Sequence, residues 1–235
     1  MRVLTLALLT TAMAAPSFAT DTPRHDAPVS FDIAFRYHVD DEVAEQDVFI
    51  ETAPGAAQVV RPDPAERNMN APLFASAEPQ RHMPFDSSAV GPFPKGAPLG
   101  LTLGEWFTAS GNGSYTCENG EGHLQVAFEG LVPEGVYTLW HYFVAWPPTE
   151  PFIGTYDLPV GSRDGAQSVF TADDEGNAVF DQTFQPCLQL TGEHLAAGLA
   201  VNWHSDDKVY GVEPGEFGHN AHIQLYSGLP ARSGL

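Results

Sequence analysis

The sequence predicts an all-β protein: an antiparallel β-sandwich of Greek-key or immunoglobulin-like type, with a long proline-rich irregular segment and one short helix. Three observations favour this fold class. Residues 31–39 and 124–129 alternate apolar and polar side chains, and a period of two places one face of a strand in a core. Further short apolar runs follow downstream. Turn-forming Gly, Pro, Asn and Asp residues separate these runs, as in a sandwich of many short strands.

The first 19 residues, MRVLTLALLTTAMAAPSFA, predict a secretory signal peptide. They contain one basic residue, an apolar centre and a small-x-small ending at Ser17 and Ala19. The apolar run is shorter than the roughly 20 residues of a membrane-spanning helix. We therefore expect a secreted or periplasmic mature protein without a transmembrane segment.

The charge balance is strongly acidic, with 30 Asp and Glu against 10 Lys and Arg and a net charge of −20. Such a surface is a poor partner for nucleic acid or anionic membranes. Acidic residues cluster in 40–47, 173–175 and 206–207. A solvated acidic surface explains these clusters more simply than calcium loops, and the chain has no EF-hand pattern.

Residues 20–52 are predicted to form an N-terminal tail followed by a hairpin that packs on the main domain. Its first strand is the alternating run 31–39, and 48–52 is expected to return beside it. Residues 53–98 contain nine prolines, which interrupt any helix or central strand. We expect this segment to wrap over the surface of a single domain.

Residues 99–227 are predicted to form the sandwich core, with 228–235 as a C-terminal tail. Thr102 and Glu105 match a capping box and predict a short helix over 103–109. A strand is expected over 114–117. The predicted central element is a β-hairpin over 123–146, with a turn at 130–135.

The second half of the predicted core contains a hairpin and two more strands. Residues 168–172 and 178–184 flank a turn of sequence DDEGN, which predicts another hairpin. Strands are expected over 195–204, with Leu199, Val201 and Trp203 on one face, and over 221–226.

The two cysteines, Cys117 and Cys187, are expected to form a disulfide in an exported chain. The alternative is a copper thiolate. His194 follows Cys187 by seven residues and no methionine comes after it, so the blue-copper pattern is not met.

Two sets of short sequence motifs resemble those of other proteins. Pro94-Lys95-Gly96 with Leu101–Trp106, and Gly130–Pro133 with Tyr137–Trp140, resemble a pattern in uncharacterised exported microbial β-proteins, over about residues 72–227. The G-L-x-P turn and the later 172–178 segment are also distantly similar to copper/zinc superoxide dismutases. That family has a His-x-His pair on the strand after the first turn, whereas only His141 is present here. The resemblance therefore implies a fold and no active site.

Histidines form the sharpest candidate site. His219 and His222 make an H-x-x-H pair, and a turn could bring them to one copper or zinc ion with His204 or His141. The alternative is that these are surface and hydrogen-bonded core histidines. For His141 in particular, the alternation of its strand favours a buried, neutral, hydrogen-bonded ring.

Aromatic residues offer a second kind of site. Trp146, Phe152 and Tyr156 follow the predicted central hairpin and are candidates for binding a small molecule, a glycan or a peptide. The chain has no G-x-S-x-G, H-E-x-x-H or Walker motif, while a Ser/His/Asp set built from distant positions stays open. We therefore expect a non-catalytic binding or accessory envelope role, with a histidine-based copper or zinc protein, possibly redox, as the alternative.

Overall fold

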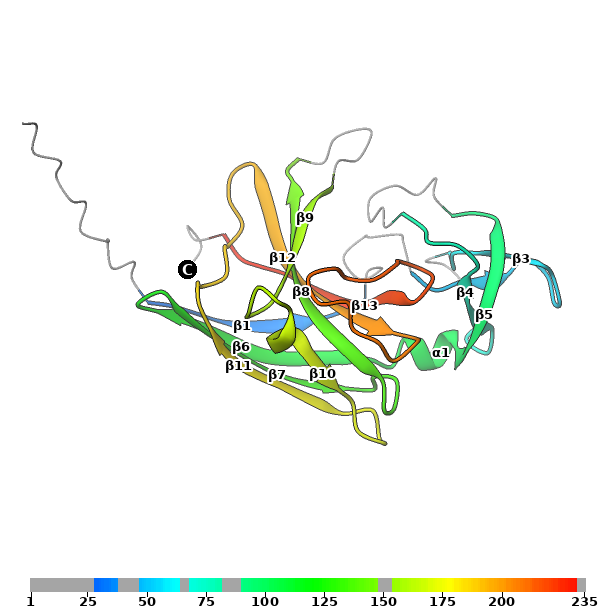
Figure 1. Cartoon of the computed structure of the whole chain (residues 1–235), viewed down its shortest axis with the longest axis horizontal. Coiled ribbons are helices and arrows are strands. Elements are labelled where there is room, and N and C mark those ends of the chain that lie inside the picture. Colours follow the sequence, from blue (N-terminus) through cyan, green and yellow to red (C-terminus); the bar gives the residue numbers. More distant parts are fainter. Residues whose placement is uncertain (1–27, 38–46, 64–67, 82–89, 148–153, 232–235) are drawn as a thin grey trace, which may run out of the picture.

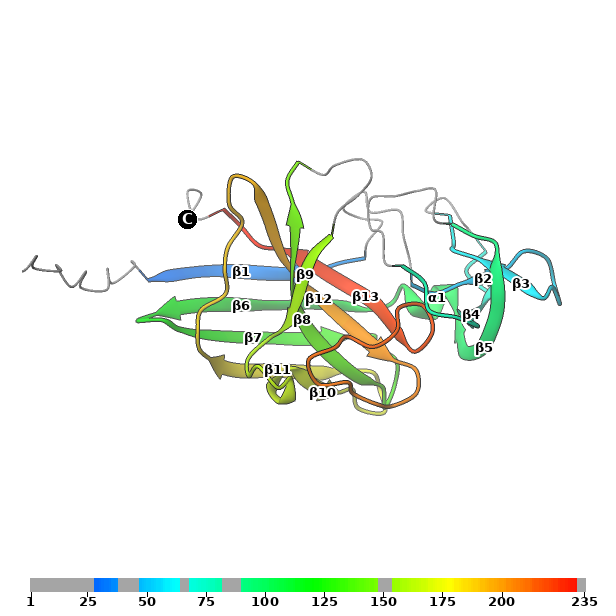
Figure 2. The ribbon, with the colours of Figure 1, turned by 45° about the horizontal axis from the view of Figure 1, so that its top comes forward.

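A computed structural model describes residues 28–37, 47–63, 68–81, 90–147 and 154–231. It confirms an all-β protein built from antiparallel sheets. Two sheets stack as a sandwich, and a third, smaller sheet lies at one end (Figures 1 and 2). The predicted signal peptide and the last four residues of the predicted tail lie outside the described ranges. No helix in the described part of the chain is long and apolar enough to cross a membrane.

Sheet 1 has the strand order β1-β6-β7-β11. The strands span Val29–Phe35 (β1), Ser110–Glu118 (β6), Glu121–Glu129 (β7) and Ala178–Phe184 (β11). In β7 every second residue is buried, beginning with Gly122 and Leu124, and the others are exposed. This sheet therefore has one core face and one solvent face, as the alternation of the sequence predicts.

Sheet 2 has the order β10-β8-β12-β13, and β9 pairs beside β8. Its strands span Val136–Ala145 (β8), Gly154–Pro159 (β9), Val169–Thr171 (β10), Leu195–His204 (β12) and Ala221–Gly228 (β13). Both faces of β8 and β12 are largely buried. The predicted strand over 195–204 is confirmed, with Leu199, Val201 and Trp203 in the core.

Aromatic rings fill much of the space between the two sheets. The Phe170 ring stacks 5.2 Å from Phe128 and 5.4 Å from Tyr137, joining sheet 1 to sheet 2. At one edge, Arg36 and Tyr226 exchange two backbone hydrogen bonds that tie β1 to β13. The predicted disulfide between Cys117 and Cys187 is confirmed and links β6 to the segment before β12.

The predicted hairpin over 123–146 is wrong in its pairing, although both strands exist. β7 pairs with β6 and β11, whereas β8 pairs with β9, β10 and β12. The intervening loop crosses from one sheet to the other, and its Leu131 is buried in the core. β7 has one buried and one exposed face, whereas β8 is buried on both faces, and the two strands belong to different sheets. The segment therefore forms an arch, in which the loop joins strands of two stacked sheets instead of two paired strands.

The predicted hairpin over 168–184 is corrected in the same way. The turn forms as expected, with the Asp173 amide donating to the Asn177 carbonyl at 2.8 Å. Its two flanking strands then diverge, because β10 pairs with β8 and β11 pairs with β7. The turn residues therefore predict where the chain reverses, but they do not predict which strand β10 or β11 pairs with.

The N-terminal hairpin and the irregular proline-rich segment are also corrected. β1 pairs with β6, and residues after 47 enter sheet 3, which has the order β2-β3-β5-β4. Its strands span Ile50–Glu51 (β2), Gln58–Val60 (β3), Pro72–Ser76 (β4) and Phe93–Thr102 (β5). β4 and β5 pair with two register shifts, a pattern that accommodates prolines lacking a ladder donor.

The capping box predicted at Thr102 and Glu105 is confirmed. The Glu105 amide donates to Thr102 Oγ1 at 3.3 Å, and the Thr102 amide donates to Glu105 Oε2 at 2.7 Å. The helix α1 spans Leu103–Trp106, shorter than the expected 103–109. It connects sheet 3 to β6, and Trp106 packs 6.1 Å from Trp203 of sheet 2.

Candidate functional site

Hydrogen-bonded polar side chains, some fully and some partly buried, gather near the point where β12 ends and β13 begins. They come from both strands of this pair, from the loop between them, from β8 and from the segment that enters sheet 3. We call this group the His222 cluster, and its members are Asp47, Arg61, Thr138, His204, Ser205, Asp206, Tyr210, Asn220 and His222.

His222 lies at the centre of the cluster and is fully buried. One ring nitrogen, Nδ1, lies 2.6 Å from the backbone oxygen of Asp47, and the other, Nε2, lies 2.9 Å from Ser205 Oγ. A carbonyl oxygen can only accept, so Nδ1 of the neutral ring carries the proton. Nε2 then accepts the hydroxyl proton of Ser205. Burial lowers the pKa of His222 to about 4, which keeps the ring neutral at pH 7.

An ion pair between Asp47 and Arg61 anchors one side of the cluster. Asp47 Oδ1 lies 3.3 Å from Arg61 Nη1, and both side chains are almost inaccessible to water. The second carboxylate oxygen of Asp47 accepts from the Ile223 amide at 3.2 Å. These bonds fix the Asp47 backbone against β13, and with it the oxygen that orients His222.

His204 lies on the opposite face of sheet 2 from Trp203, its neighbour on β12. Its Nε2 lies 2.8 Å from Thr138 Oγ1, which also accepts from Trp140 Nε1 at 2.7 Å. Within the described ranges, His204 Nδ1 and Asn202 Oδ1 are buried without a hydrogen-bond partner. Burial lowers the pKa of His204 to about 4, so this ring is also neutral at pH 7.

The loop between β12 and β13 adds a second hydrogen-bonded set to the cluster. Tyr210 donates to Asp206 Oδ2 at 2.5 Å and accepts from Asn220 Nδ2 at 2.5 Å. Desolvation and the neighbouring Asp206 carboxylate raise the pKa of Tyr210 to about 12. The phenol therefore stays protonated and holds the loop in place.

Three of the four predicted metal ligands, His204, His219 and His222, come to this end of sheet 2. His219 Nδ1 donates to the Ser76 carbonyl at 3.0 Å. His141 lies apart from them, on the core face of β8, where Nε2 donates to the Gln189 carbonyl at 3.0 Å and burial lowers its pKa to about 4.

The four histidines do not converge on one point in this structure. Among the described residues, the only group of three His, Cys, Asp or Glu side chains with ligand atoms within 4.8 Å of one another is Asp173, Asp174 and Glu175, in the exposed β10–β11 turn. A copper or zinc ion at His222 would have to replace two hydrogen bonds that its ring already makes.

Two of the three predicted ligand-binding aromatics are described, and both are exposed. Trp146, after β8, is 49% exposed, and Tyr156, on β9, is 55% exposed. Phe152 lies outside the described residues. Leu158, which the sequence did not single out, is 48% exposed on β9. We call β9 with the end of β8 and Trp146 the β8–β9 arm.

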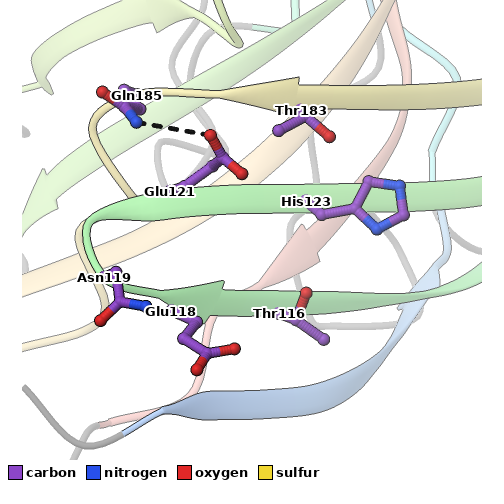
Figure 3. A pocket seen from close by; sticks show the side chains of 7 residues that line it. All are labelled: Thr116, Glu118, Asn119, Glu121, His123, Thr183 and Gln185. Atoms are coloured by element: carbon purple, nitrogen blue, oxygen red, sulfur yellow. Dashed lines mark hydrogen bonds between the residues drawn. The ribbon is translucent and has the colours of Figure 1, made fainter.

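A polar hollow opens on the solvent face of sheet 1 (Figure 3). Its lining comes from the ends of β6, β7 and β11 and consists of Thr116, Glu118, Asn119, Glu121, His123, Thr183 and Gln185. His123 is held by Asp181, whose Oδ1 lies 2.8 Å from His123 Nε2. The hollow offers hydrogen-bonding groups and no aromatic ring other than the imidazole, so it differs in character from the β8–β9 arm.

Comparison of the chain with protein-family models, with curated proteins and with solved structures gave no match. The sequence did not single out Ser205, Arg61 or Tyr210, and Asp47 entered only as the end of the acidic cluster 40–47. Each is an ordinary residue in a stretch without a motif, and only the pairing of β12 with β13 and the docking of residue 47 bring them together.

Proposed function

We propose that the protein is an exported binding protein whose ligand, a small molecule, glycan or peptide, contacts the β8–β9 arm. The observation that supports this proposal is the exposure of large apolar side chains on one antiparallel pair: Tyr156 and Leu158 on β9, and Trp146 directly after β8, are each about half exposed. Such side chains are usually buried, and an exposed group of them is typical of an interaction surface.

The arm presents these side chains on a supported scaffold. Tyr156 lies directly opposite Phe143 in the β8–β9 ladder, with ring centroids 4.8 Å apart. Leu158 lies opposite the buried His141. Tyr156 and Leu158 therefore share a face with the buried Phe143 and His141, so one side of each exposed side chain is supported by the core. Aromatic faces held this way suit the apolar face of a sugar ring or an apolar peptide side chain.

Binding is tested by screening the purified mature chain against a glycan array and a peptide library. For any ligand found, Trp146→Ala and Tyr156→Ala are each expected to weaken binding about tenfold or more, since truncating an aromatic anchor costs more than about 1.4 kcal/mol. Both variants should keep the wild-type melting temperature, because the two side chains are half exposed.

The matched control is Val179→Ala, on β11 of sheet 1, where Val179 is 65% exposed and far in the fold from the arm. This variant should bind like wild type. Unchanged affinity in both arm variants would reject the arm as the binding surface.

Export is supported by the signal-like first 19 residues and by the disulfide, which oxidising compartments maintain. A mature form beginning at Thr20 in the extracytoplasmic fraction is the expected result of N-terminal sequencing. A chain that retains Met1 in the cytoplasm would contradict export.

A further inference from the structure

We propose that Ser205 is an activated nucleophile, with His222 as its general base, and that it takes the acyl group from carboxylic esters. This reactivity lies in the His222 cluster, separate from the β8–β9 arm, and goes beyond the proposed binding role. It rests on the geometry of the Ser205 hydroxyl, the His222 ring and the backbone carbonyl of Asp47, which lies 175 positions before His222.

The geometry contains the three parts that activation of a serine requires. Ser205 Oγ is 2.9 Å from Nε2 of His222, within reach for transfer of the hydroxyl proton. The opposite nitrogen, Nδ1, is held by the Asp47 carbonyl at 2.6 Å. This contact fixes the tautomer that leaves the Nε2 lone pair toward the serine. A nucleophile, a base and a group that orients the base is the general arrangement of serine hydrolase sites.

Each part is held by an independent set of contacts. The His222 ring lies 5.4 Å from the ring of Trp203, its neighbour across the β12–β13 ladder. Asp47 is fixed by its ion pair with Arg61 and by the Ile223 amide. A base positioned this firmly does not have to be reoriented before it accepts a proton.

Ser205 is the only one of the three groups that solvent reaches. It directly follows β12 and is partly exposed, whereas His222 and Asp47 are fully buried. Its amide donates to the Asn220 carbonyl at 3.1 Å, and two residues later Asp207 adopts a positive φ of 57° in a tight turn. Ser205 is therefore the member of the set through which an ester would have to approach, because its residue is partly exposed while its base is fully buried.

The reaction would proceed by acyl transfer. Ser205 Oγ forms a bond to the carbonyl carbon of the ester while its proton moves to His222 Nε2. The bond from that carbon to the alkoxy oxygen then breaks, and the alcohol leaves with the proton from His222. Water then gives a proton to the same nitrogen as its oxygen bonds to the acyl carbon. The bond from that carbon to Ser205 Oγ breaks, the carboxylic acid leaves, and Oγ takes the proton back from His222.

The test uses a fluorophosphonate, which phosphonylates activated serines, and p-nitrophenyl acetate as the ester. Wild-type protein should take up one phosphonate per chain, located on Ser205 by peptide mass spectrometry, and should release a burst of p-nitrophenolate. Ser205→Ala removes the nucleophile and should abolish this labelling, whereas loss of the base should lower its rate about 100-fold or more, the size of a typical general-base contribution.

A matched control is Ser162→Ala. Ser162 is also partly exposed in a loop, but its hydroxyl donates to the Asp164 carboxylate at 2.5 Å and contacts no histidine. This variant should label like wild type. His222→Asn should lose labelling while keeping a donor toward the Asp47 carbonyl, and circular dichroism verifies that it is folded.

Three results would overturn the proposal. Wild type that is not phosphonylated at Ser205 would do so without any variant. Labelling of Ser162 at the same rate as Ser205 would show ordinary hydroxyl reactivity. A folded His222→Asn variant that labels like wild type would show that the histidine is not the base. Each result is independent of ligand binding at the β8–β9 arm.

Discussion

Arg61 carries a charge into a part of the molecule that water hardly reaches, and Asp47 is the carboxylate that compensates it. The guanidinium also donates to the Arg81 carbonyl at 3.1 Å and lies 5.0 Å from the centre of the Phe49 ring. Three kinds of contact thus hold one side chain. Removing it would leave the Asp47 carboxylate buried without its positive partner.

Arg61→Met is therefore expected to reduce the free energy of unfolding by about 3–5 kcal/mol, the usual cost of breaking a buried pair on one side. Urea unfolding followed by tryptophan fluorescence measures it. The control is Lys95→Met, which removes a more accessible ion pair with Glu51 at 2.7 Å. A surface pair contributes little, so a loss as large in the control would contradict the role of burial.

Individual residues show how far the sequence could predict the site. For His141, alternation along its strand favoured a buried hydrogen-bonded ring, and the ring is buried with a bond to the Gln189 carbonyl. No comparable pattern exists for His222, whose orienting partner Asp47 lies 175 positions earlier. Alternation of apolar and polar residues shows which face of a strand is buried. It carries no information about a hydrogen bond from a segment that is distant in the sequence.

At the scale of elements, the strands were more predictable than their partners. Most expected strands in the described ranges exist, and the helix begins at the capping box. Both predicted internal hairpins proved to be arches between the two sheets. Local sequence determines where a chain reverses, while the choice between a hairpin and an arch depends on whether the loop can be buried. In the first arch the loop residue Leu131 is buried in the core.

The β6–β7 pair depends on Gly113 of β6, which lies just before the strand that the sequence predicts over 114–117. A Cβ added at Gly113 would lie 1.9 Å from the Gln125 carbonyl oxygen on the neighbouring strand. Gly113→Ala is expected to force the two strands apart and to lower the free energy of unfolding by about 1–3 kcal/mol, as overpacking usually does.

Gly228→Ala, at the end of β13, is the matched control, because a Cβ there meets nothing within 4 Å. Urea unfolding should show wild-type stability for this variant. Equal stability of the Gly113 variant would mean that β6 and β7 adjust to the extra methyl group at no cost, contrary to the close approach of their backbones.

For the whole molecule, three buried histidines link stability to pH. Burial lowers the pKa of His141, His204 and His222 to about 4 in the folded protein, against an ordinary value of 6.5. The unfolded chain therefore binds these protons at a higher pH than the folded chain does. Stability is fully present above about pH 6.5 and is lost as the pH falls toward 4.

The expected loss between pH 7 and pH 5 is about 2 kcal/mol for each of the three histidines. Carboxylates with lowered pKa values, such as Asp181 beside His123, act in the same direction but at lower pH, around and below their ordinary value of 3.8. Urea unfolding at pH 7, 6 and 5 thus reports mainly on the histidines.

His141→Gln keeps a donor for the Gln189 carbonyl and removes one of the three protons that the unfolded chain takes up. The stability of this variant should therefore depend on pH about a third less than that of wild type. Stability that stays constant from pH 7 to pH 5 in the wild type would mean that the three rings take up protons without leaving the folded state.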